Sequence, residues 1–189
     1  MKKFTSLFLL LVAVFCLSVP WTQKAEAARI AVLPLQIDPA VEADKAKDAD
    51  TPDYGALYWE LAAMLYKYPS FDMVGDDDLA KAVPAEGLKK FDRTALEDVA
   101  NKTGADIVVV MRLDKLREKA INYRYEPMLD MFMQGEFASL NRVTGKYYHT
   151  DIYEKDSIEE QLTVRRNARQ DYFVKNAKRY MKRAVELKQ

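Results

Sequence analysis

The chain has 189 residues, and its 29 basic and 29 acidic side chains cancel at pH 7. This length suits one domain that buries most of its apolar surface, and the balanced charge gives no sign of a nucleic-acid-binding protein. Cys16 is the one cysteine, so the chain holds no internal disulfide and no zinc site built from several cysteines.

The first 27 residues have the pattern of a secretory signal peptide. Lys2 and Lys3 precede an almost unbroken apolar run, and Ala25-Glu26-Ala27 has the small-x-small pattern that signal peptidase cleaves. We therefore expect a signal peptide at 1–27, cleaved after Ala27, and one domain at 28–189. The mature protein would be exported to the periplasm or cell envelope and be soluble there.

Two other interpretations of this segment stay open. The first is a retained membrane anchor, although the apolar run is shorter than the roughly 20 residues that span a bilayer. The second is a lipoprotein modified on Cys16, which the bulky Phe15 before it disfavours.

Strand and helix patterns alternate through the first part of the mature chain. Apolar residues recur at helical spacing from Tyr54 to Tyr68, and Phe91 and Leu96 flank Asp92 as a hydrophobic staple flanks a helix cap. The β-branched run around Val109 is typical of a strand in the middle of a sheet. The expected elements are a strand at 29–35, a loop at 38–53, a helix capped by Thr51 and ended by Pro69, a strand at 71–74, a short helix at 76–83, a helix from Asp92 to Gly104 and a strand at 105–113.

The second half reads as three further strands and a last helix. The strands are expected at 120–125, 129–141 and 146–153, with a turn at 141–145 and a bulge near Gly135. Ser157 and Glu160 form a capping-box pattern that would begin a helix running to about residue 188. The fold class is therefore α/β (α+β): one mixed sheet of five to six strands with packed helices, parallel at first and antiparallel later.

Three segments carry a family resemblance. They are Arg29-Ile-Ala-Val-Leu-Pro-Leu35, Thr103-Gly-Ala-Asp-Ile-Val-Val-Val110 and Thr144-Gly-Lys146. The chain resembles the α/β domain in the N-terminal part of the Tol translocation protein B, the curli secretion channel protein and the lipoprotein activators of penicillin-binding proteins. The resemblance implies a non-enzymatic envelope part that contacts other envelope proteins or self-assembles, and it brings no catalytic residue.

Two side-chain groups could carry chemistry but have simpler explanations. His149 could serve a hydrolase with Ser139 across the hairpin, but no nucleophile signature accompanies it. Three acids at 76–78 could bind a cation, but acids there also favour the start of a helix. We expect no enzyme, no cofactor and no metal, with a His149-centred enzyme as a distant third hypothesis.

Binding is the expected activity, and two surfaces are candidates for it. The partner would be another envelope protein or a second copy of the chain; a glycan, a small anion, an anionic membrane surface or a wall polymer is the alternative, and nucleic acid is not expected. The last helix is basic, although its cations could simply balance the acids at 38–53 and 76–78. The candidate residues are Tyr123, Tyr125, Tyr147, Arg165, Arg169, Lys178, Arg179 and Lys182.

Overall fold

The computed structural model describes residues 27–41, 52–67, 70–124, 126–159 and 168–186, and it builds them around one mixed sheet. The strand order is β3-β1-β4-β5-β6, and the short β2 pairs with β4. Parallel pairing joins β1 to β3 and to β4, while β4, β5 and β6 are antiparallel neighbours, as predicted. The strands are β1 (Ala28–Val32), β2 (Gln36–Ile37), β3 (Phe71–Met73), β4 (Ile107–Tyr123), β5 (Glu126–Asn141) and β6 (Lys146–Glu159).

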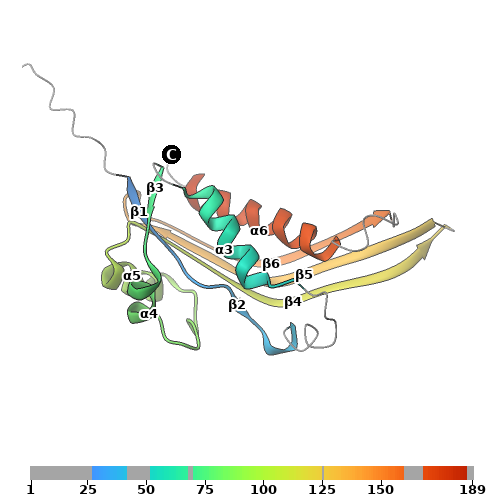
Figure 1. The fold of residues 1–189 in the computed structure, drawn as a ribbon, viewed down its shortest axis with the longest axis horizontal. Helices are drawn as coiled ribbons and strands as arrows, with labels where there is room; N and C mark the ends of the chain where they lie inside the picture. The colour runs from blue at the N-terminus through green and yellow to red at the C-terminus, as the bar shows by residue number, and fades with distance from the viewer. Residues whose placement is uncertain (1–26, 42–51, 68–69, 125, 160–167, 187–189) are drawn as a thin grey trace, which may run out of the picture.

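Helices cover the two faces of the sheet unequally (Figure 1). Above the sheet in this view lie α3 (Tyr54–Leu65) and α6 (Ala168–Glu186), and α6 follows the long strands for much of their length. Below it lie α4 (Asp76–Ala82) and α5 (Arg93–Thr103), which are confined to the end where β4 begins.

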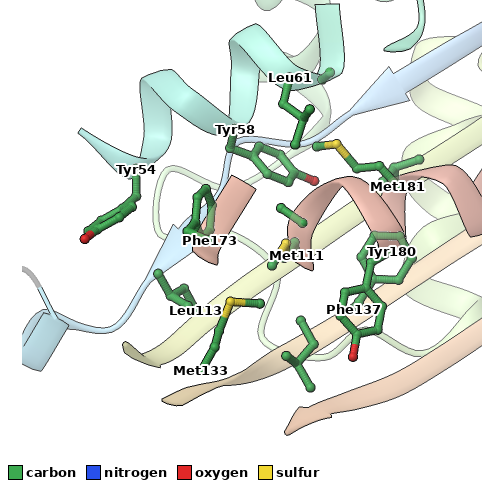
Figure 2. Packing of buried hydrophobic residues seen from close by; sticks show 14 of the residues in the cluster. Tyr54, Tyr58, Leu61, Met111, Leu113, Met133, Phe137, Phe173, Tyr180 and Met181 are labelled. Atoms are coloured by element: carbon green, nitrogen blue, oxygen red, sulfur yellow. The ribbon is translucent and has the colours of Figure 1, made fainter. Parts of the chain in front are cut away.

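Each face has its own hydrophobic core, and β4 contributes to both. Val109 and Met111 face α3 and α6, whereas Val108 and Val110 face α5, and all four are fully buried. This explains the continuous apolar run and confirms that the strand is central. On the α6 face, the Phe173 ring packs edge-on to Tyr54, and further side chains from both helices meet the sheet (Figure 2).

The helix boundaries follow local capping rules with one correction. Asp53, not the expected Thr51, caps α3 through bonds from Gly55 N and Ala56 N, and Thr51 lies outside the described residues. Asp92 caps α5 with its Oδ1 2.9 Å from Ala95 N, as predicted, and Gly104 ends that helix at φ 67°.

The predicted break after residue 113 is wrong, because β4 is one strand of 17 residues. The pairing with β5 shifts between Leu113 and Lys115, so Asp114 is the extra residue of a bulge on β4. Gly135, where the bulge was expected, lies directly opposite, paired with Leu113. Because the bulge adds one residue to β4, the alternation of apolar residues shifts by one position there and the strand continues beyond it.

The predicted start of the last helix is also wrong. Ser157 belongs to β6, which continues to Glu159, and its hydroxyl donates to Asp130 Oδ1 at 2.5 Å. Ser157 is in a strand because β6 pairs with β5 along this segment, and that pairing outweighs the local capping pattern. The described part of the helix begins at Ala168.

Beyond α4 and α5 the three antiparallel strands continue as a projection that we call the arm (Figure 1). It comprises residues 115–123 of β4, 126–134 of β5 and 153–159 of β6. One face of the arm packs under α6 through Leu116, Leu129 and Met131, which are buried. The opposite face carries the side chains of the residues that alternate with these along each strand.

Candidate interaction surface

The predicted binding residues fall into several places. Arg165 and Tyr125 lie outside the described residues, as does the predicted signal peptide up to Glu26; for Tyr123 only the backbone, at the end of β4, is described. Ala27, the predicted cleavage site, directly precedes β1.

Three of the six cations of α6 are paired with acids on the sheet beneath them. Lys175 Nζ lies 3.3 Å from Asp156, Arg169 Nε lies 3.7 Å from Glu118, and Arg179 is bonded to Glu154. For Arg179, desolvation alone would lower the pKa, but bonds to Tyr180 and Glu154 outweigh it and raise the pKa. Among the described residues, the acids that pair with these three cations come from β4 and β6.

Two of the predicted helix cations remain without an ion pair in the part of the chain that the structure describes. Lys178 is half-buried and Lys182 is exposed, and both lie on α6. They keep the basic helix open as a candidate surface.

Tyr147 is held by the protein itself. Its ring packs against the α5 core, and its hydroxyl donates to the carbonyl oxygen of Phe91 at 2.5 Å. Burial raises the pKa of Tyr147, and the carboxylates of Asp92 and Glu136 add to the effect. This contact fastens β6 to the segment that enters α5.

His149 belongs to a hydrogen-bonded cluster, and Ser139, its predicted partner in a hydrolase, does not lie beside it. Its Nε2 lies 2.6 Å from Glu136 Oε1, and Arg112 lies 2.6 Å from Glu136 Oε2. Ser139 projects to the opposite face of the sheet, where it is buried, so it cannot meet His149. Arg112 also pairs with Asp114 at 2.7 Å; these two acids outweigh desolvation and raise the pKa of Arg112.

This cluster lines a shallow groove of about 350 Å³ at the border between α5 and the arm. Arg112, Glu136 and His149 are already bonded to one another, whereas Lys89 and Lys90, which also line the groove, have no ion pair among the described residues. The groove lies at the edge of the covered part of this face, and no described serine or threonine hydroxyl lines it.

The open face of the arm gathers aromatic rings and cations in rows across the strands. Register places Phe132 between Arg117 on β4 and Lys155 on β6, and the next row carries Lys115 and Tyr153. The rings of Phe132 and Tyr153 meet edge-to-face with centroids 5.1 Å apart, and Tyr153 is 70% exposed. We call this surface the arm patch and define it by Lys115, Arg117, Lys119, Phe132, Tyr153 and Lys155.

The cations of the arm patch differ from the three paired cations of α6. No acidic partner lies within ion-pair distance of Lys115, Arg117, Lys119 or Lys155 among the described residues. These cations lie beside the exposed Tyr153 ring, and the register places Asp130 opposite Lys119 on the same face. Such a combination is typical of a binding surface rather than of a merely solvated face.

The sequence did carry one sign of this patch. Lys115, Arg117 and Lys119 alternate with Leu116 and Glu118, which is the two-residue period of a strand with one open face. The rows themselves depend on the pairing register of three strands.

The acids at 76–78 form the first turn of α4. Gly75 is the N-cap, without a side-chain bond, and Asp78 pairs with Arg29 and Lys81. Within the described ranges, no three His, Cys, Asp or Glu side chains are grouped to hold a metal ion. Nor is any helix among those residues both long and apolar enough to span a membrane.

No family model matches the sequence, and no curated protein matches it. Solved structures with a similar fold include lipoprotein GNA1162 from Neisseria meningitidis, with 10% identity, TM-score 0.41, and 79% of this chain aligned to 96% of that chain. The C-terminal domain of LpoB from Salmonella enterica has 15% identity and TM-score 0.35, with 71% of this chain aligned to 84% of that one.

A third neighbour, a PelC dodecamer from Paraburkholderia phytofirmans, has 14% identity and TM-score 0.38, with 86% of this chain aligned to 88% of that chain. The resemblance to penicillin-binding-protein activator lipoproteins that the sequence indicated is found again in the LpoB domain. At TM-scores below 0.5, none of these likenesses indicates what the chain binds.

Proposed function

We propose that this protein is an exported, non-enzymatic module of the cell envelope that binds another envelope protein through the arm patch. The observation that supports it most directly is the Arg117–Phe132–Lys155 row, where an aromatic side chain lies between two cations that have no acidic partner in the described structure. The signal-peptide pattern supports the location.

The chemistry of the patch specifies the kind of partner. Phe132 and Tyr153 supply a large apolar contact at little entropic cost, and aromatic residues are enriched at the energetic centres of interfaces. The surrounding cations favour an acidic surface and would accelerate association with it. The partner is therefore an envelope protein that presents acidic residues around an apolar contact.

The experiment starts from photo-crosslinking in the native cell, with a photoreactive residue in place of Tyr153. The mature N-terminus, expected at Ala28, is read from the same envelope fraction. The cross-linked protein is identified, purified and titrated with this chain. The double variant Arg117→Glu/Lys155→Glu should weaken that binding at least tenfold, because the loss of two attractive charges is compounded by two repulsive ones.

The matched control is Lys178→Glu/Lys182→Glu on α6. It makes the same change of charge at two cations that also lack a described ion pair, on the opposite face of the sheet. It should leave affinity within about twofold. If the α6 control weakened binding and the patch variant did not, the binding surface would be α6 and the proposed arm patch would be wrong. Cross-links to wall polymer alone, or a cytosolic species that retains Met1, would also overturn the proposal.

A further inference from the structure

A second hollow lies on the sheet edge, where β3 ends before its neighbour. β3 stops at Met73, whereas the chain of β1 continues past Leu33 into β2 along β4. The chain leaves β1 toward α3 on one face and leaves β3 toward α4 on the other. In open α/β sheets, the crevice at the carboxyl ends of two such strands is where ligands bind.

A groove of about 530 Å³ occupies this position, which is within the usual size range of small-ligand sites. Leu33, Leu35 and Ile37 form one wall. The other wall comes from α4 and the chain just after it, including Leu79 and Val83. The lining positions of α4 are 76, 79 and 80, which share one face of the helix, and the C-cap Val83 continues that wall. The floor of the groove is therefore predominantly apolar.

The part of the second wall that follows α4 is held against β2. With its amide oriented to suit both neighbours, Gln36 donates to Leu88 O at 3.1 Å and accepts from Leu88 N at 2.7 Å. Gly87 has φ 81°, and a Cβ there would lie 2.5 Å from the Gln36 side chain. The segment 84–88 thus packs closely on the strand, which makes the groove preformed and lowers the entropic cost of binding.

Acidic groups line the mouth of this apolar groove. Asp76 and Glu86 are exposed lining residues, and neither has an ion pair among the described residues. Asp77 adjoins Asp76 in the same helical turn and adds negative potential. A carboxylate or phosphate ligand would be repelled here, whereas a cationic group would be attracted.

We propose that this groove binds a small amphiphile with an apolar chain or ring and a protonated amine. The apolar part would lie against Leu35, Leu79 and Val83, and the ammonium would lie between Asp76 and Glu86. This inference does not depend on the arm patch, which lies on other strands.

The test uses three eight-carbon probes of one chain length on residues 28–189: octylamine, 1-octanol and octanoate, titrated by calorimetry and by backbone NMR at pH 7. Octylamine should bind at least tenfold more tightly than octanoate, with octanol between them. The double variant Asp76→Asn/Glu86→Gln should bring octylamine to the affinity of octanol without weakening octanol.

Steric variants locate the site. Ala80→Trp places a large side chain in the groove and should abolish binding, whereas Ala56→Trp, at an exposed position of α3 on the other face, should not. Ala85→Trp, in the segment that follows α4, is the second groove variant and is used if circular dichroism shows that Ala80→Trp is unfolded. Equal affinity for octanoate and octylamine, no saturable binding by the wild type, or unchanged binding in both groove variants would each overturn the proposal.

Discussion

The tyrosine hydroxyls inside the core on the α6 side differ in whether they form a hydrogen bond. Tyr66 donates to Met181 O at 2.7 Å and so ties the end of α3 to α6. The hydroxyls of Tyr58 and Tyr172 are buried, and neither has a hydrogen-bond partner in the described structure. Burial raises the pKa of all three, because the phenolate form would lose its hydration. A buried hydroxyl without a partner loses its hydration with no hydrogen bond in return, and its phenolate form would lose still more.

Tyr172 gives a pH prediction. Burial, with Glu154 and Asp156 adding to it, raises the pKa of Tyr172 to about 12, whereas the unfolded chain ionises near 10. The corresponding stabilisation is complete below pH 10 and is lost as pH rises toward 12, since only the unfolded state releases the proton there. Tyr172→Phe should therefore lose stability less steeply across that window and match the wild type within about 1 kcal/mol at pH 7.

Urea unfolding at pH 7, 10 and 11.5 measures this difference. Tyr153→Phe is the control, because that ring is 70% exposed, and its curve should follow the wild type. Parallel losses of stability in the wild type and in Tyr172→Phe would contradict the assignment.

At the scale of elements, the bulge of β4 and the glycine opposite it form one unit. Asp114 is the extra residue, and it holds Arg112 Nε at 2.7 Å. Gly135 lies so close to β4 that an added Cβ would be 2.0 Å from Arg112 O, a backbone atom that cannot rotate away. Only glycine fits opposite the bulge, because any Cβ there would collide with the backbone of β4. Beyond the bulge, alternate residues of β4 continue to face the two sides of the arm.

Gly135→Ala should destabilise the protein by about 2 kcal/mol or more, because strand pairing must widen to admit the methyl group. Gly75→Ala is the control: φ is −71° there and a Cβ would meet nothing within 4 Å, so its cost should stay below about 1 kcal/mol. Chemical denaturation of both variants measures the difference between their losses of unfolding free energy. Equal losses would mean that the strands move apart easily at the bulge.

Local signals in the sequence predicted most elements, and pairing between distant segments explains the failures. The Asp92 cap, Gly104 and the β-branched run were recognisable because each acts within a few residues. Ser157 was misassigned because its capping pattern competes with pairing to Asp130, 27 residues away in sequence. The arm patch and the acids that pair with α6 depend on the same register, so composition alone could not place them.

At the scale of the whole molecule, one sheet joins two cores that contact different helices. β4 has fully buried side chains on both faces near α5, so loss of packing on one face affects the same strand that supports the other. The two faces should therefore unfold together as one cooperative unit, in spite of the separate helices that cover them.

Leu96→Ala on the α5 face and Met181→Ala on the α6 face test this, because both side chains are fully buried. Each should cost about 2–5 kcal/mol. Trp59 on α3 is the only tryptophan in residues 28–189 and reports on the α6 face. Leu96→Ala should lower the melting temperature seen by Trp59 fluorescence and by far-ultraviolet circular dichroism equally, whereas Val143→Ala, at a 73% exposed turn position, should leave both unchanged. An early loss of helix signal with an unshifted Trp59 transition would show that α4 and α5 unfold independently of the sheet.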